Sequence, residues 1–209
     1  MMIRFMVTLC LFSLSCLPLR AETLTLLALG DSLTAGLGLP ASEAFPAQLA
    51  AALRAKGHDV VIINAGVSGD IAAQGAERLD WALSDEVDGV LVELGANDAL
   101  RGLPVAQAET ALEQILQKLG ERKLPVLLLG MKAPPNLGAD YASAFDGMYP
   151  RLASKFNIPI YPFFLEGVAA NGKLNQADGI HPTAQGVAII VGKSLSQVEG
   201  LLEIIKKLP

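Results

Sequence analysis

Apolar and polar residues alternate along the chain in blocks that predict strands and helices in turn. Apolar, strand-like runs cover residues 23–29, 60–65, 90–94, 126–129 and, more weakly, 158–161. Helix-like stretches lie between and after them, at residues 45–56, 71–83, 105–122, 141–156 and 183–207. Strands that are apolar throughout are typical of a parallel sheet buried on both faces. The pattern therefore predicts a single, doubly wound α/β domain. We expect a flavodoxin-like three-layer sandwich, in which five parallel strands take the order 2-1-3-4-5.

The N-terminal segment does not fit this alternation. Arg4 gives it a positive charge, and a run of apolar and small polar residues follows from 5 to 19. That run is shorter than the ~20 residues that a membrane-spanning helix needs. We therefore expect residues 1–21, ending in the small residue Ala21, to be a secretory signal peptide, and residues 22–209 to form the mature domain.

The positions of the cysteines agree with an exported protein. The chain has two, Cys10 and Cys16, and both precede the expected cleavage site. The mature protein would then contain no disulfide and no cysteine metal site. A lipoprotein anchored through Cys16 is the alternative, although the residues before it suit lipidation poorly. The sequence thus predicts a bacterial periplasmic or secreted protein with no stable membrane span.

Composition narrows the class of partner. The chain has 209 residues, enough for one domain with its own core, and a net charge of −5. Nucleic-acid phosphates attract a basic surface, so this acidic balance argues against a nucleic-acid partner. We expect a monomer that acts on small molecules.

Small and polar residues follow the first three predicted strands. Ser32 follows the first strand, Gly69 the second and Asn97 the third. In the predicted strand order these carboxyl ends converge on one crevice. A hydroxyl, a glycine N–H and a side-chain amide could there supply a nucleophile and the donors of an oxyanion hole, with the N–H of Ser32 as a further donor.

A serine nucleophile needs a base, and the chain has only two histidines. His58 follows Gly57 at the amino edge of the sheet, where we expect a solvated turn residue. His181 lies after the last strand, at the same edge as Ser32. Asp178, three residues earlier, could accept the imidazole N–H and fix its tautomer.

Each of these residues also has a plain structural interpretation. The turn at Ser32 could be a phosphate-binding helix N-terminus, although it lacks the lysine and glycines of a phosphate loop. Asp31, Asp70 and Asp98 could cap turns and helices. Asp178 and His181 could bind a metal, but no third ligand is suitably spaced. A non-catalytic binding module on the same fold is therefore the alternative from another class of protein.

Taken together, four segments resemble the GDSL, or SGNH, hydrolase family. They are Gly30-Asp31-Ser32-Leu33, Ser68-Gly69-Asp70, Gly95-Ala96-Asn97-Asp98, and Asp178 with His181. The resemblance covers essentially the whole mature chain. It is greatest to periplasmic multifunctional esterases known as thioesterase I, lysophospholipase and arylesterase. It implies Ser32, His181 and Asp178 as a catalytic triad, and Ser32, Gly69 and Asn97 as the oxyanion hole.

The resemblance also implies a substrate class. Family members of this group hydrolyse aryl esters, acyl thioesters and lysophospholipids without a metal or cofactor, in a shallow acyl groove. Leu100, Leu103 and Leu137 are candidates for lining that groove, although they could equally pack internally. An acetyl esterase acting on a cell-envelope polysaccharide would use the same catalytic residues and is the nearer alternative.

Overall fold

The computed structural model describes residues 23–84 and 86–208. The expected signal peptide, with both cysteines, lies outside the described residues. In the described part of the chain, no helix is long and apolar enough to cross a membrane.

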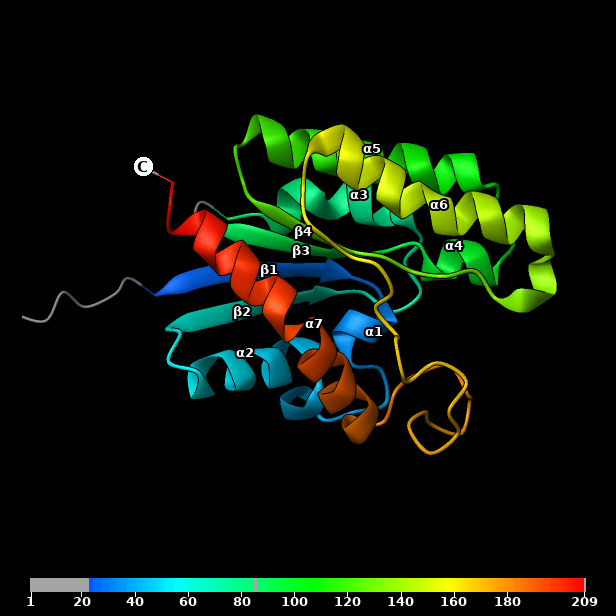
Figure 1. The fold of residues 1–209 in the computed structure, drawn as a ribbon, viewed down its shortest axis with the longest axis horizontal. Coiled ribbons are helices and arrows are strands. Elements are labelled where there is room, and N and C mark those ends of the chain that lie inside the picture. Colours follow the sequence, from blue (N-terminus) through cyan, green and yellow to red (C-terminus); the bar gives the residue numbers. More distant parts are fainter. Residues whose placement is uncertain (1–22, 85, 209) are drawn as a thin grey trace, which may run out of the picture.

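The centre of the molecule is a parallel sheet of five strands in the order β2-β1-β3-β4-β5, which confirms the predicted topology (Figure 1). The strands are β1 (Leu24–Gly30), β2 (Val60–Gly66), β3 (Gly89–Glu93), β4 (Val126–Leu129) and β5 (Ile160–Tyr161). All residues of β3 and β4 are buried, as expected for apolar strands covered on both faces.

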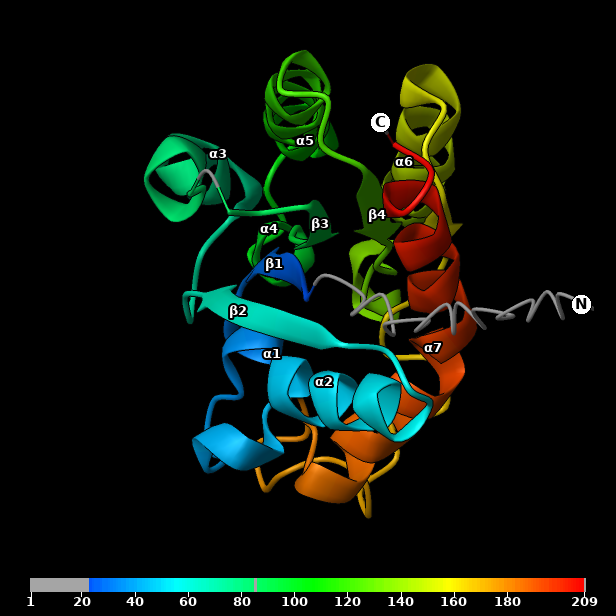
Figure 2. The same cartoon turned by 90° about the vertical axis from the view of Figure 1, so that its left-hand side faces the viewer.

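Two layers of helices cover the sheet (Figure 2). The helices of one layer are α3 (Ala72–Ala82), α5 (Val105–Glu121) and α6 (Ala139–Phe156), and those of the other are α2 (Phe45–Ala55) and α7 (Ala184–Ile205). On α5 the buried positions recur every three or four residues, so one face of the helix packs inward. These five helices match the five that the sequence predicts.

Four short elements were not predicted: α1 (Ser32–Ala35), α4 (Ala96–Leu100) and the 3₁₀ turns at Ala41–Glu43 and Pro135–Leu137. Helices of four or five residues are too short to show a hydrophobic period. Two of them carry candidate site residues: α1, which starts just after β1, contains Ser32, and α4, which starts just after β3, contains Asn97. Both therefore begin at the carboxyl edge of the sheet, where the sequence places the candidate chemistry.

Candidate active site

Ser32 is the first residue of α1, in a sharp turn between strand and helix. The Asp31 side chain caps this helix, because its Oδ1 accepts the backbone N–H of Leu33 at 2.9 Å. Gly30 before the turn leaves no room for a side chain, since a Cβ there would collide with Thr34. The turn is thus fixed on both sides, and it presents the Ser32 hydroxyl at the end of β1.

His181 lies beside this hydroxyl. Its Nε2 is 2.9 Å from Ser32 Oγ, although 149 positions separate the two residues in the sequence. On the other side of the ring, Nδ1 is 2.7 Å from Asp178 Oδ2. The structure therefore brings together Ser32, His181 and Asp178 in the order that nucleophile, base and orienting acid require.

Asp178 is held by the turn that carries His181. Its Oδ1 accepts the backbone N–H groups of Ile180, at 2.9 Å, and of His181, at 3.0 Å. Hydrogen bonds from the His181 backbone and ring, followed by the Ile180 N–H, lower the pKa of Asp178 to about 2. Gly179 adopts φ +74°, which closes this turn. Asp178 is thus a carboxylate at any neutral pH.

Gln176 was not singled out in the sequence, yet it connects the two halves of the site. Its Nε2 donates to the carbonyl of Leu37, at 2.7 Å, and to that of Pro182, at 3.0 Å. Its backbone N–H donates to the His181 carbonyl at 2.7 Å. Gln176 therefore ties the loop of His181 to the loop that follows the Ser32 helix.

Asn97 and Gly69 follow β3 and β2, the two strands that flank β1 in the sheet. Asn97 Nδ2 donates to Asp31 Oδ2 and to the carbonyl of Asp70, both at 3.0 Å. Arg101 Nη2 donates to the carbonyl of Gly69 at 2.6 Å. The loops after the first three strands are thereby joined. Both amide hydrogens of Asn97 have acceptors here, so a substrate oxygen must share one of these hydrogens or replace its acceptor.

The three neighbouring aspartates have structural partners, and Asp31 and Asp98 accept N–H groups at helix starts, in line with the interpretation of them as capping residues. Besides capping α1, Asp31 accepts from Asn97, and Asp98 Oδ2 accepts the N–H of Ala72 at the start of α3, at 2.8 Å. Asp70 instead forms an ion pair with Arg78 at 2.6 Å. Burial raises the pKa of Asp31 to about 6, against the hydrogen bonds from Leu33 and Asn97 that lower it.

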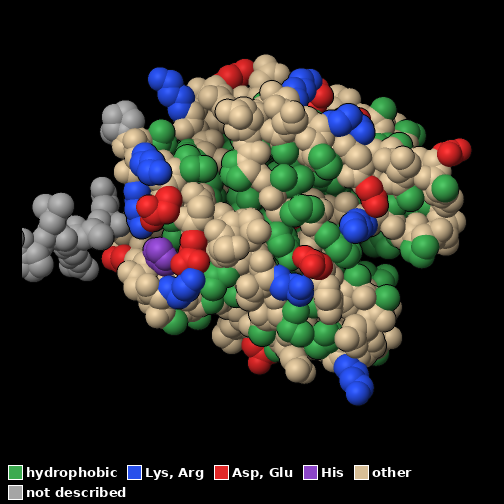
Figure 3. Space-filling view, in the orientation of Figure 1, with side chains coloured by type: hydrophobic (Ala, Val, Ile, Leu, Met, Phe, Trp, Pro, Cys, Tyr) green, Lys and Arg blue, Asp and Glu red, His purple; other side chains and the backbone are tan. Residues whose placement is uncertain are grey.

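A cavity of about 530 Å³ opens beside Ser32, Asn97 and His181. Its walls are mostly apolar and come from Leu100, Met131, Pro134, Phe163, Leu165 and Ile180. The surface is hollowed where α4 and α6 approach the loop before α7, and hydrophobic side chains gather along the hollow (Figure 3). The volume lies within the ~300–1,000 Å³ range of small-molecule sites.

Only one of the three leucines expected in the groove lines this cavity. Leu100 does, with 49% of its surface exposed. Leu103 and Leu137 are not among its lining residues. The backbone of Leu103 ends a turn, in which its N–H donates to the Asp98 carbonyl and its own carbonyl accepts the Tyr141 hydroxyl at 2.8 Å. Leu137 is half-buried and lies close to Gly102. The walls come instead from loops after β4 and β5, which hydrophobic periodicity does not describe.

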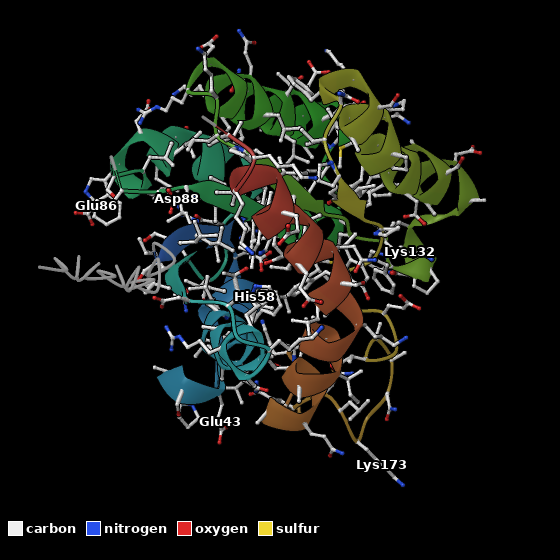
Figure 4. The ribbon with its side chains drawn as sticks, turned by 60° about the vertical axis from the view of Figure 1, so that its left-hand side comes forward. Glu43, His58, Glu86, Asp88, Lys132 and Lys173 are labelled. Carbon is white, nitrogen blue, oxygen red and sulfur yellow. The ribbon has the colours of Figure 1, made fainter. Side chains whose placement is uncertain are left out.

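His58 lies away from the cavity, beside α2 and α7, while Lys132 marks the cavity's edge (Figure 4). His58 lies at the amino edge of the sheet, as predicted, but it is not a solvated turn residue. Its Nε2 is 3.1 Å from Glu199 Oε1, and 20% of its side chain is exposed. The packing of α7 against α2 buries it, a long-range contact that local sequence does not reveal.

Metal binding finds no further support from the geometry. Among the described residues, no three His, Cys, Asp or Glu side chains are grouped as a metal site would require. Asp178 and His181 therefore have no third ligand within that part of the chain.

Comparisons with known proteins agree with this arrangement. The model of the GDSL-like Lipase/Acylhydrolase family matches residues 28–189. Esterase TesA of Pseudomonas aeruginosa is 43% identical over 164 residues, which are 78% of this chain and 82% of that protein. Thioesterase 1/protease 1/lysophospholipase L1 of Escherichia coli is 41% identical over 179 residues, or 85% of each chain.

A solved structure shows the same fold at similar identity. The crystal structure of AlinE4, an SGNH-hydrolase family esterase, superposes with a TM-score of 0.73 and 49% identity, over 87% of this chain and 97% of that one. The family resemblance seen in the four sequence segments is thus confirmed. The chain belongs to the GDSL-like lipase/acylhydrolase family and is a carboxylic ester hydrolase.

Proposed function

We propose that this enzyme hydrolyses acyl esters and thioesters through an acyl-enzyme formed on Ser32, with His181 as the base and Asp178 as its orienting partner. The observation that carries the proposal is the chain of two short contacts, 2.9 Å from Ser32 Oγ to His181 Nε2 and 2.7 Å from His181 Nδ1 to Asp178 Oδ2. A histidine held between a hydroxyl and a carboxylate can take the hydroxyl proton while its positive charge is stabilised.

In the first half of the reaction, Ser32 Oγ attacks the acyl carbonyl carbon and its proton moves to His181 Nε2. The carbonyl oxygen becomes negative, and the N–H groups of Ser32 and Gly69 with one N–H of the Asn97 amide stabilise it. His181 then gives its proton to the leaving alcohol or thiol as the tetrahedral intermediate collapses. This leaves an ester between the acyl group and Ser32.

Water completes the cycle by the reverse sequence. His181 takes a proton from the water as its oxygen attacks the acyl carbon, and the same donors stabilise the oxyanion. Return of the proton to Ser32 Oγ releases the carboxylic acid. Asp178 stays ionised throughout, consistent with its pKa of about 2.

The shape of the cavity supports medium or long acyl groups over acetyl. Its walls are mostly apolar, and the Lys132 ammonium, 5.2 Å from the centre of the Phe163 ring, lies at its edge. Aryl esters, acyl thioesters and lysophospholipids all combine an apolar acyl chain with a reactive carbonyl. If the enzyme were instead an acetyl esterase acting on a cell-envelope polysaccharide, it would prefer acetyl esters to esters of longer acyl groups. Rates on acetyl, butyryl and octanoyl esters, each compared with its thioester, separate these two functions.

Replacement of the nucleophile tests the proposal itself. We expect Ser32→Ala to remove nearly all hydrolysis of p-nitrophenyl esters while the protein stays folded by circular dichroism. A folded Ser32→Ala variant that works at the parent rate would exclude Ser32 as nucleophile. A non-catalytic binding module would also leave a fluorophosphonate probe unreacted, whereas the proposed enzyme gains the probe's mass at Ser32.

Export is part of the same proposal. Residues 1–21 would direct the chain out of the cytoplasm, to the periplasm or the medium, where the domain of residues 22–209 acts as a monomer. The mass of the exported protein distinguishes cleavage after Ala21 from lipidation at Cys16. Light scattering on the purified protein measures its oligomeric state.

A further inference from the structure

Two carboxyl groups are buried directly beneath the turn that carries Ser32. Asp31 is 0% exposed and Glu93, the last residue of β3, is 1% exposed. Glu93 Oε2 accepts the Thr34 hydroxyl at 2.8 Å and is 3.4 Å from the backbone nitrogen of Asp31. These two donors flank Ser32 in sequence. Glu93 thus contacts the nucleophile's turn on both sides, yet the reaction described above does not use it.

The two carboxyl groups differ in the donors that they receive. Asp31 accepts the Leu33 N–H on one oxygen and the Asn97 amide on the other. Glu93 receives its donors on Oε2, whereas its Oε1 is buried without a hydrogen-bond partner among the described residues. A buried carboxylate oxygen that accepts no hydrogen bond is strongly destabilised, and protonation removes the charge that causes this. The negative charge of the pair therefore belongs on Asp31.

The surrounding ionisable groups also favour a negative charge on Asp31 and a proton on Glu93. Of the other ionisable groups, His181 acts on Asp31, and Tyr149 lies near both carboxyl groups. The nearby guanidinium of Arg78 is paired with Asp70 and contributes its remaining N–H groups to backbone carbonyls. Burial, followed by the charge of Asp31, raises the pKa of Glu93 well above its usual value. Two adjacent carboxylates in the interior do not both ionise.

We propose that Glu93 is a neutral carboxylic acid in the working enzyme and a positioning residue, which holds the Ser32 turn through Thr34 and Asp31. The charge left on Asp31 then aims the Asn97 amide. A second negative charge here would oppose the negative charge that develops on the substrate oxygen. This inference rests on the proposed function, because that function places Ser32 and Asn97 at the reacting carbonyl.

Infrared spectroscopy on the whole protein tests the protonation state without reference to activity. At pH 7 we expect a C=O stretching band of a protonated carboxylic acid, lost in Glu93→Gln. The band should persist in Ser32→Ala, so the protonation is tested even where the proposed function fails. Absence of the band from the parent enzyme, or its survival in Glu93→Gln, would overturn the proposal. If Glu93→Gln does not fold, Thr34→Val provides a second test. Because this variant removes the hydroxyl that donates to Glu93, the band should move to higher frequency, and an unshifted band would overturn the proposal.

Kinetics test the positioning role. Glu93→Gln keeps a neutral group that can accept both donors, so kcat should stay within about 3-fold of the parent. Glu93→Leu offers no acceptor, and we expect kcat to fall roughly 10-fold or more with KM changed less than about 2-fold. A folded Glu93→Gln variant slowed about 100-fold would show that the ionised form is needed. A Glu93→Leu variant with the parent kcat would show that Glu93 does not position the turn.

Discussion

Gln176 Nε2 donates a hydrogen bond to the carbonyl oxygen of Leu37 at 2.7 Å, and this bond joins the loop of the base to the loop of the nucleophile. The two residues are 139 positions apart. Since each loop leaves a different strand, the rigidity of the sheet alone does not fix the distance from Ser32 to His181. The side chain of Gln176 supplies the missing connection.

Loss of this side chain should loosen the pair of catalytic residues. We expect Gln176→Ala to lower kcat several-fold with little change in KM. It should also lower the free energy of unfolding by about 1–3 kcal/mol, because two hydrogen bonds are lost. Urea denaturation and steady-state kinetics measure the two effects. Gln117→Ala is the matched control, since the Gln117 side chain donates to Glu121 on the exposed surface of α5, away from the site. Equal behaviour of the two variants would contradict this role.

Asp178 gives the enzyme a defined sensitivity to acid. Its pKa of about 2 in the folded protein lies below the ordinary value of 3.8. A lowered carboxyl pKa means that the unfolded state binds the proton more readily, so stability falls as pH falls. The contribution is complete above about pH 4 and disappears as pH approaches 2.

The free energy of unfolding of the parent and of Asp178→Asn, measured by urea between pH 2 and pH 6, checks this expectation. The parent should be the more stable of the two at pH 6, and the difference should shrink toward zero at pH 2. A difference that is constant over the whole range would mean that the Asp178 charge does not stabilise the fold.

Leu100 and Leu103 are a matched pair for testing the acyl site, because only Leu100 lines the cavity. Leu100→Ala removes apolar surface that an acyl chain would cover, so kcat/KM for octanoyl esters should fall about 5-fold relative to acetyl esters, equivalent to ~1 kcal/mol. Leu103→Ala should leave that ratio unchanged. If Leu103→Ala changes the chain-length preference as much as Leu100→Ala does, the acyl group binds elsewhere.

Glu93 predicts an opposite pH dependence to that of Asp178. A carboxyl whose pKa is raised in the folded state takes up a proton on folding, so its contribution weakens as pH rises above 4.5. Stability of the parent relative to Glu93→Gln should therefore decline by up to about 1.4 kcal/mol per pH unit above that value. Urea denaturation of both proteins from pH 4 to pH 7 measures the slope. Parallel curves would show that Glu93 is ionised in the folded enzyme.

The sequence was informative where physical constraints are local. Buried parallel strands need unbroken apolar residues, so the five strands were predictable. Their order came from the expected flavodoxin-like arrangement and not from the apolar runs. Ser32, Asn97 and His181 were predictable as neighbours because each follows a strand at the same edge of the sheet.

Features that depend on long-range contacts were not predictable in this way. Glu93 ends an apolar strand, and nothing near it in sequence indicates that Thr34 and Asp31 are its partners. Leu103 lies in a loop and Leu137 ends a short 3₁₀ turn, and hydrophobic periodicity in such segments does not say which side faces the cavity. The contact of His58 with Glu199 depends on α7, which is formed by the end of the chain.

The central claim, that Ser32 and His181 work as one unit, is tested most directly by a double-mutant cycle on kcat. Residues that act together lose their effect together, so Ser32→Ala, His181→Ala and the double variant should all be slowed to about the same extent, within ~3-fold of one another. The claim would be contradicted if the double variant were slower by the product of the two single losses, or if either single variant kept the parent rate.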